Sequence, residues 1–154
     1  IRETVFNWLQ PYLHQSRCLD VFAGSGVLGF EALSRGAEKT IFIELNKKTV
    51  ENLRQNINTL AADKAQVIQQ DALHWLASAR VDDCFDLVFL DPPFQMDLLG
   101  KACVALNNSG CLAEDAIIYV EHNVDTEVDI PENWVCLKEK KAGQVAYKLF
   151  ERQT

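Results

Sequence analysis

The chain has 154 residues, of which 48% are hydrophobic and 24% charged, and its formal net charge is −7. This length predicts one domain over residues 1–154, and the composition excludes a disordered or fibrous protein. No apolar run approaches the roughly 20 residues that span a bilayer, so we expect no membrane partner. Five scattered cysteines without a CxxC pair favour a cytoplasmic protein with reduced thiols and no metal site. Nothing demands an oligomer, and we expect a monomer.

The charge is spread unevenly along the chain. Residues 1–80 carry nine Lys and Arg against eight Asp and Glu, whereas residues 81–154 carry six against fourteen. Because affinity for phosphate comes from clustered Lys and Arg, an acidic chain is a poor non-specific binder of nucleic acid. Any nucleic-acid partner therefore needs a local basic surface, or one supplied by a segment that this sequence does not contain.

Apolar periodicity predicts five alternations of strand and helix. The first helix is expected over residues 3–9 and stops near Pro11, and a strand at 18–22 leads through a Gly-rich turn into a helix at 27–35. Further strands are expected at 39–45, 66–69, 85–90 and 116–121, and further helices at 46–60, 71–79 and 98–107. Two last strands, 134–140 and 145–150, read as a hairpin on the edge of the sheet.

This order of elements predicts an open α/β fold. We expect a Rossmann-like, mostly parallel seven-stranded sheet with an antiparallel C-terminal hairpin strand and helices on both faces. In such sheets, ligands bind at the carboxyl ends of the strands. The loops that directly follow the predicted strands are therefore the candidate walls of a site.

The first of these loops carries a nucleotide-binding pattern. Residues 24–29 fit G-x-G-x-x-G between a strand and a helix, where glycines let a nucleotide approach the backbone, although the same turn also occurs without a ligand. Glu44 ends the second strand, 20 residues after Gly24, where an acid can bind ribose hydroxyls. NAD and S-adenosylmethionine both carry such a ribose. Asp20, four residues before Gly24, would repel a pyrophosphate but suits the ammonium group of an amino-acid-bearing cofactor.

The sequence Asp91-Pro92-Pro93-Phe94 follows the fourth predicted strand. Asp91 and the carbonyl of Pro92 can both accept hydrogen bonds from a planar NH₂ group, and Phe94 offers a stacking face for the ring that bears it. Asp-Pro alone would equally well start a helix, with Asp at the cap. The second Pro, the aromatic residue and the Gly loop upstream favour chemistry on an amino group.

Together, these residues resemble the motif set of class I S-adenosylmethionine-dependent methyltransferases that methylate amino groups. The whole chain also resembles the RsmD family, through the segments RETVFNWL (2–9), CLDVFAGSG (18–26) and AGQVAY (142–147). Members of that family are bacterial enzymes that methylate the exocyclic N2 of one guanine in 16S ribosomal RNA of the small subunit. The resemblance implies a single methyltransferase domain with the class I fold. It also implies an N-terminal basic hairpin that grips RNA; this sequence lacks one, which would account for its acidic balance.

The resemblance implies ten residues that bind S-adenosylmethionine: Asp20, Phe22, Ala23, Gly24, Ser25, Gly26, Glu44, Leu45, Asp71 and Ala72. The Gly-rich loop would cradle the methionine part, with Asp20 close to its amino group. Glu44 would hold the ribose hydroxyls and Leu45 would pack on the adenine. Asp71 would accept a hydrogen bond from the adenine amine, beside backbone contacts from Ala72.

The resemblance also implies a methyl-transfer site formed by Asp91, Pro92, Pro93 and Phe94. In this interpretation a guanine leaves its stack, lies against Phe94, and presents N2 to Asp91 and the Pro92 carbonyl for in-line displacement. Arg2, Phe94 and Lys141 are the candidate contacts to the RNA.

The motifs alone leave other functions open. Adenine N6 and a protein glutamine amide are also planar NH₂ targets, and only the resemblance over the whole chain favours guanine. The Gly pattern also fits an NAD-binding oxidoreductase, which Asp20 and the Pro-Pro-Phe turn oppose. A non-catalytic RNA-binding module with the same fold is opposed by the intact Asp91 and Phe94.

Overall fold

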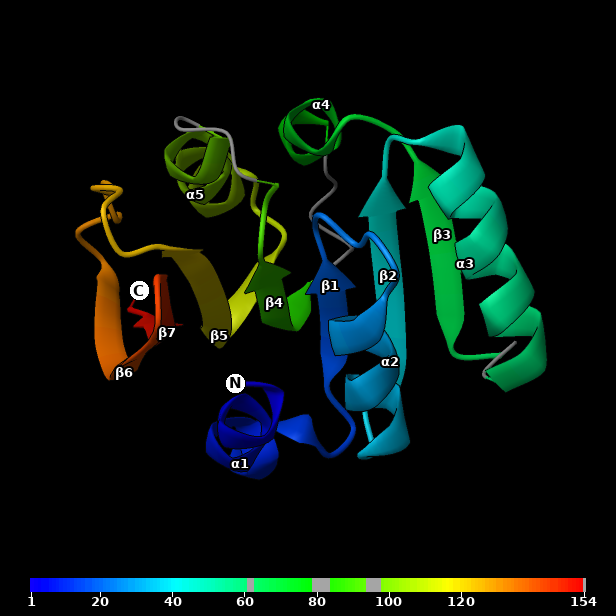
Figure 1. Ribbon diagram of the computed structural model, residues 1–154, viewed down its shortest axis with the longest axis horizontal. Helices are drawn as coiled ribbons and strands as arrows, with labels where there is room; N and C mark the ends of the chain where they lie inside the picture. The colour runs from blue at the N-terminus through cyan, green and yellow to red at the C-terminus, as the bar shows by residue number, and fades with distance from the viewer. Residues whose placement is uncertain (61–62, 79–83, 94–97, 154) are drawn as a thin grey trace.

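The computed structural model describes residues 1–60, 63–78, 84–93 and 98–153. The elements in chain order are α1 (Arg2–Leu13), β1 (Arg17–Asp20), α2 (Val27–Ser34), β2 (Lys39–Glu44), α3 (Lys47–Leu60), β3 (Ala65–Gln69), α4 (Ala72–Ala77), β4 (Phe85–Leu90), α5 (Leu98–Asn108), β5 (Leu112–Asn123), β6 (Trp134–Ala142) and β7 (Val145–Arg152) (Figure 1). The strands form a seven-stranded sheet in the order β3-β2-β1-β4-β5-β7-β6. Pairing is parallel from β3 through β5, whereas β7 is antiparallel to both β5 and β6. The predicted fold class is confirmed.

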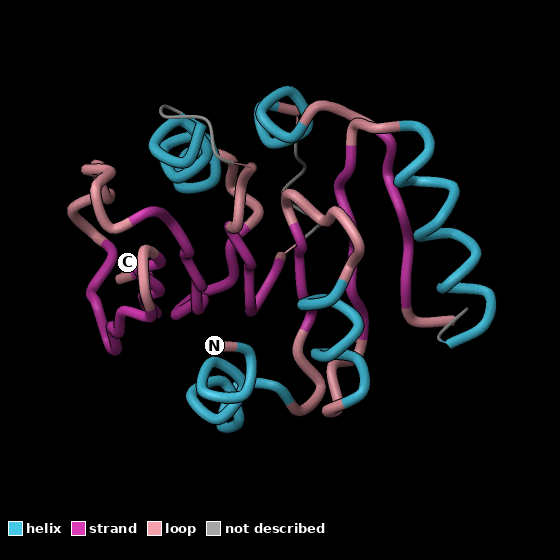
Figure 2. The backbone as a smooth tube through the Cα atoms, in the orientation of Figure 1, coloured by secondary structure: helices cyan, strands magenta, loops and turns pink. Residues whose placement is uncertain are grey.

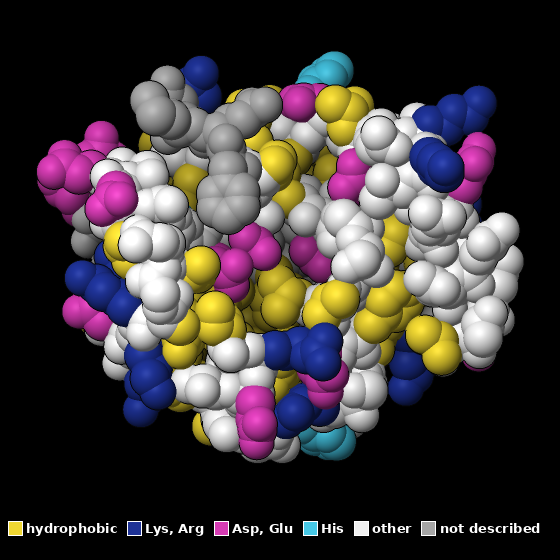
Figure 3. Space-filling model, viewed as in Figure 1, with side chains coloured by type: hydrophobic (Ala, Val, Ile, Leu, Met, Phe, Trp, Pro, Cys, Tyr) yellow, Lys and Arg dark blue, Asp and Glu magenta, His cyan; other side chains and the backbone are white. Residues whose placement is uncertain are grey.

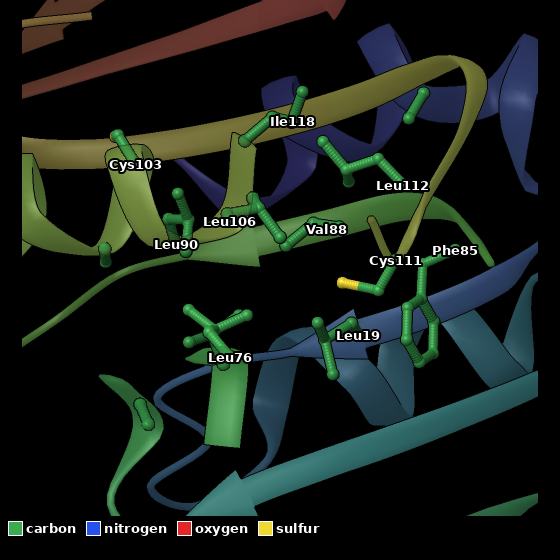
Figure 4. Packing of buried hydrophobic residues seen from close by; sticks show 14 of the residues in the cluster. Leu19, Leu76, Phe85, Val88, Leu90, Cys103, Leu106, Cys111, Leu112 and Ile118 are labelled. Carbon is green, nitrogen blue, oxygen red and sulfur yellow. The ribbon is translucent and has the colours of Figure 1, made fainter. Parts of the chain in front are cut away.

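Helices cover both faces of the sheet, with α4 and α5 on one side and α1, α2 and α3 on the other (Figures 1 and 2). Successive residues of a strand point to opposite faces, so each inner strand supplies side chains to both layers. Figure 4 shows one layer, in which Leu19 of β1, Val88 of β4 and Ile118 of β5 pack with residues of α4 and α5. None of the helices within the described ranges is long and apolar enough to cross a membrane.

The prediction that the first helix stops near Pro11 is wrong, because α1 continues to Leu13. A proline inside a helix removes one backbone hydrogen bond and costs about 3 kcal/mol. Pro11 itself is exposed, but Leu13 is fully buried and belongs to the same cluster as Phe6 and Leu9. Burying a leucine side chain contributes about 1.5–3 kcal/mol, which offsets most of the proline's effect.

Strand β5 is longer than the predicted 116–121, and its first half pairs irregularly with β4. Phe85 lies opposite Leu112, but Leu87 lies opposite Ile117, so five steps along β5 match two along β4. The intervening Asp115 has a positive φ of 60° and is exposed. Beyond this irregularity the register is regular up to the pair of Leu90 with Val120. The residues that follow this pair are therefore neighbours at the carboxyl edge of the sheet.

Two glycines of the G-x-G-x-x-G pattern are required, one by the backbone conformation at the start of α2 and one by the packing of α2 on the sheet. Gly26 precedes the first residue of α2 with φ of 81°, in the left-handed region that favours glycine. At Gly29 an added Cβ would clash with the ring of Phe42 on β2. The close approach fixes the start of α2, and with it the loop between β1 and α2.

Candidate cofactor and methyl-transfer site

A cleft of about 720 Å³ lies at the carboxyl ends of the parallel strands. It is lined by Val21, Phe22, Ala23, Gly24, Ser25, Ile43, Glu44, Leu45, Gln70, Asp71, Ala72, Asp91, Pro92, Pro93, Leu98 and Glu121. The structure thus brings together most of the residues that the sequence singled out, from four separate loops. In the view of Figure 3, acidic side chains gather in the hollow near the centre of the face.

Glu44 is held in place by two backbone hydrogen bonds. The N–H of Gly24 donates to Oε1 at 2.9 Å, and the N–H of Asn46 donates to Oε2 at 2.9 Å. Each carboxylate oxygen has two lone pairs, so one remains on each oxygen for a ligand hydroxyl. The first bond also ties the loop after β1 to the end of β2. Beside this carboxylate, Leu45 is 62% exposed and offers an apolar surface on the cleft wall.

Asp20 is not among the residues that line the cleft, and its carboxylate contacts the last glycine of the Gly pattern. It is 3% exposed, and its Oδ2 accepts a hydrogen bond from the N–H of Gly29 at 3.3 Å. Burial raises the pKa of Asp20 to about 8, and the negative charges of Asp91 and Glu44 act in the same direction. A cation close to this carboxyl would favour its ionised form. Gly26 is likewise absent from the lining and has the structural role described above.

Asp71 is the N-cap of α4. Its Oδ2 accepts a hydrogen bond from the backbone N–H of His74 at 3.0 Å. A carboxylate has a second oxygen, so capping the helix is compatible with contact to a ligand in the cleft. Ala72 follows directly and is 7% exposed.

Glu121, which the sequence analysis missed, lies beside Asp91 in the cleft. The hydroxyl of Tyr119 donates to Oε1 of Glu121 at 2.6 Å, and Asp91 is hydrogen-bonded to the same carboxylate. Burial raises the pKa of Asp91 to about 7, and the charge and hydrogen bond of Glu121 add to this shift. The available signal was an acid at the end of an apolar run, the same pattern that pointed to Glu44.

Of the three candidate RNA contacts, Arg2 and Lys141 do not line the cleft. Phe94 lies outside the described residues, so its predicted stacking role is not tested. Arg2 lies in the first turn of α1. It is near Glu31 of α2, whose pKa is lowered mainly by Arg35 and more weakly by Arg2. Lys141 is exposed near the end of β6, at the outer edge of the sheet.

The cleft is acidic and suits a cationic ligand. Four carboxylates line it, and its lining includes no Lys, Arg or His within the ranges described. Among those same residues, no group of His, Cys, Asp and Glu side chains is arranged to hold a metal ion. A pyrophosphate would be repelled here, whereas an ammonium or sulfonium group, or the N–H groups of an amine, would be attracted.

Comparisons with known proteins agree with this geometry. A family model described as "Conserved hypothetical protein 95" matches residues 1–151. "Ribosomal RNA small subunit methyltransferase D" of Haemophilus influenzae is 48% identical over 153 residues, which cover 98% of this chain and 79% of that protein. The Escherichia coli K12 protein of the same name is 44% identical over 154 residues, or 99% of this chain and 77% of that protein. A solved structure described as putative methyltransferase yhhF from Escherichia coli superposes with a TM-score of 0.92 at 43% identity, covering 99% and 84% of the two chains. The chain therefore belongs to the RsmD family of methyltransferases.

Proposed function

We propose that this protein transfers a methyl group from S-adenosylmethionine to the exocyclic N2 of a guanine in 16S ribosomal RNA of the small subunit, acting as a cytoplasmic monomer. The observation that carries the proposal is one acidic cleft that holds both the fixed Glu44 carboxylate and the Asp91-Pro92 acceptor pair. The relatives named as ribosomal RNA methyltransferases support RNA as the substrate. Adenine N6 and a glutamine amide are less favoured, because no relative cited above is named for them.

The chain's own residues would divide the work between binding and orientation. Glu44 would hold the ribose hydroxyls, and the exposed side chain of Leu45 would cover the adenine. When bound, S-adenosylmethionine supplies an electrophilic methyl group on a positively charged sulfur. The carboxylate of Asp91 and the carbonyl of Pro92 would accept the N–H groups of the target amine and direct its lone pair toward that methyl group. Phe94 would stack on the base, with Arg2 and Lys141 as outer RNA contacts.

The first test is calorimetric titration with S-adenosylhomocysteine, with NAD as the competing ligand. We expect S-adenosylhomocysteine to bind and NAD not to bind. Replacing Glu44→Ala removes two hydrogen bonds to a charged acceptor and frees the loop at Gly24, so affinity should fall about 10- to 100-fold. Glu114→Ala is the matched control, because Glu114 is an exposed glutamate far from the cleft lining. Binding of NAD alone, or an unchanged affinity in Glu44→Ala, would contradict the assignment of the cleft.

The substrate is tested by incubating small subunits and naked 16S RNA, both lacking the modification, with radiolabelled S-adenosylmethionine. Nuclease digestion and mass spectrometry should place the label on N2-methylguanosine. Label on N6-methyladenosine, or on protein, would overturn the choice of guanine and leave the methyltransferase assignment intact.

A further inference from the structure

Three oxygen-bearing side chains form a hydrogen-bonded chain across two neighbouring strands at the rim of the cleft. Because Leu90 pairs with Val120, Asp91 and Glu121 emerge side by side from β4 and β5. Tyr119 is fully buried as a residue, and its hydroxyl is 2.6 Å from Oε1 of Glu121. Phenol, carboxylate and carboxyl group are thus linked in the order Tyr119, Glu121, Asp91.

With Asp91 protonated, this chain of groups holds one more proton than two free carboxylates would. A hydrogen bond between two carboxyl groups requires a proton between them, because both ionised groups are acceptors only. Glu121 already accepts the O–H of Tyr119, so one of its oxygens is engaged as an acceptor. Asp91 is therefore the member that carries the proton, consistent with the upward shift of its pKa.

No positive charge in the described structure relieves the pair. The charged group that raises the pKa of Asp91 is Glu121 on β5. Asp91 in turn raises the pKa of the buried Asp20 on β1, and Tyr147 on β7 raises that of Tyr119. From α5, the cleft is lined by the apolar Leu98. A cation that enters the cleft would therefore change the electrostatic potential at the carboxyl group of Asp91.

We propose that Glu121 is a positioning residue which, held by Tyr119, keeps a proton on Asp91 until a cationic ligand enters the cleft, and that the ligand expels this proton to solvent. The inference rests on the proposed function, in which the ligand is a sulfonium. An opposite charge within about 4–6 Å lowers the pKa of a carboxyl group by about 1–3 units, enough to ionise Asp91 at neutral pH. The neutral thioether product has no sulfonium charge and does not have this effect.

Asp91 then accepts the proton that methyl transfer releases. The amine nitrogen forms its bond to the methyl carbon while the carbon–sulfur bond breaks, and the electron pair of that bond returns to sulfur. The nitrogen now carries one proton too many, which passes to the ionised Asp91. Loss of the sulfonium charge in the same step restores the preference of Asp91 for its protonated form. Asp91 thereby becomes fully ionised, and a stronger hydrogen-bond acceptor, when the methyl donor is present.

The inference is tested first without any ligand, by carbon-13 NMR of the whole chain labelled at the side-chain carboxyl carbons of Asp and Glu. The Asp91 signal is identified by its absence in Asp91→Asn. We expect it to titrate near pH 7 in the native chain and at least one unit lower in Glu121→Gln, where the neighbouring charge is gone. In the nearly isosteric Tyr119→Phe, Glu121 is no longer held by the phenol, so the Asp91 signal should titrate at lower pH than in the native chain. An Asp91 that titrates near pH 4 in the native chain overturns the inference.

A second measurement tests the response to a cation, by calorimetry at about pH 6.5 in two buffers of different ionisation enthalpy. We expect the native chain to release roughly half to one proton more on binding S-adenosylmethionine than on binding S-adenosylhomocysteine. This excess should largely disappear in Asp91→Asn and Glu121→Gln and persist in the control Glu114→Gln. Equal proton release for both ligands overturns the inference. If neither ligand binds, the proposed function fails, while the NMR titration still decides the state of the carboxyl pair.

Discussion

Acidic side chains lie at both ends of the parallel strands, which we call the carboxyl edge and the amino edge of the sheet. The two groups differ in how far water reaches them. At the carboxyl edge, Asp91 and Glu121 are half-buried within the cleft of about 720 Å³. At the amino edge, Asp86, Glu114 and Asp115 are exposed around a hollow of about 280 Å³. Acids of the same type are thus close together at both edges. At the carboxyl edge, desolvation raises the pKa of Asp91.

The exposed group illustrates how acids look when water stabilises their charge. Oδ2 of Asp86 accepts a hydrogen bond from the N–H of Arg17 at 2.9 Å, which fastens the start of β1. Such a contact serves the local backbone and requires no ligand. In this protein, burial and mutual contact of acidic residues identify the candidate active site. The number of acidic residues does not, because both edges carry several.

The largest effect that distinguishes the two edges is expected for Asp91→Ala, on the rate of methyl transfer. Removing the acceptor of the target amine and of its proton should lower single-turnover methyl transfer about 10²- to 10⁴-fold. The affinity for S-adenosylhomocysteine should change only a few-fold, because Glu44 and the Gly loop are untouched. The two quantities are measured by transfer of labelled methyl to RNA and by calorimetry. Near-normal transfer in this variant, or an equal loss in Glu114→Ala, would remove the distinction between the two edges.

A smaller effect, on stability, is expected for Asp20→Asn. The pKa of Asp20 is about 8 in the folded chain and near 4 when unfolded, so the folded state binds more protons between these pH values. Ionisation of Asp20 therefore weakens the native fold as pH rises from 4 to 8. Asparagine does not titrate and keeps an acceptor for the N–H of Gly29. Relative to the native chain, the variant should gain on the order of 1–3 kcal/mol between pH 5 and pH 8.

The urea midpoints of both proteins at the two pH values measure this gain. Because other titrating groups are common to both chains, the difference between them isolates Asp20. A stability gap that stays constant between pH 5 and pH 8 would show that Asp20 titrates normally and is not desolvated.

The smallest effect is expected at the amino edge, for Asp86→Asn. The amide oxygen can still accept the hydrogen bond from the N–H of Arg17, and the side chain is exposed. The free energy of unfolding should stay within about 0.5 kcal/mol of the native value at both pH values. Ligand affinity should be unchanged by calorimetry. A pH-dependent gain as large as that of Asp20→Asn would mean that burial is not what separates the two edges.

The sequence was sufficient where function depends on residues that follow one another along the chain. The Gly loop and Glu44 are separated by one helix and one strand, so their spacing predicts that they meet, and the bond from Gly24 confirms the contact. Strand–helix alternation likewise predicted the sheet, because each apolar run was long enough to be read by its period. The roles assigned to these residues in binding stay predictions.

Glu121 was missed because its partner is distant in the chain. Its position beside Asp91 follows from the register of β4 and β5, which nothing in the local sequence reveals. The hydrogen bond from the N–H of Gly29 to the carboxylate of Asp20 joins β1 to α2, a contact that the sequence did not reveal. The end of α1 was misplaced because burial of Leu13 offsets most of the local effect of Pro11. In each case, contacts between separate elements decided the outcome.

The irregular pairing of β5 with β4 makes the two edges unequal in their tolerance of insertions and deletions. The extra residues between Leu112 and Ile117 already bulge from the ladder, so a further change in length there need not move the register beyond Ile117. One added residue between 118 and 121 would instead turn Glu121 to the opposite face of the sheet. Loop-length variation is therefore expected to collect at the amino edge. The exposed turn around Asp115 is also the place to attach a fluorophore or an affinity tag without disturbing the cleft.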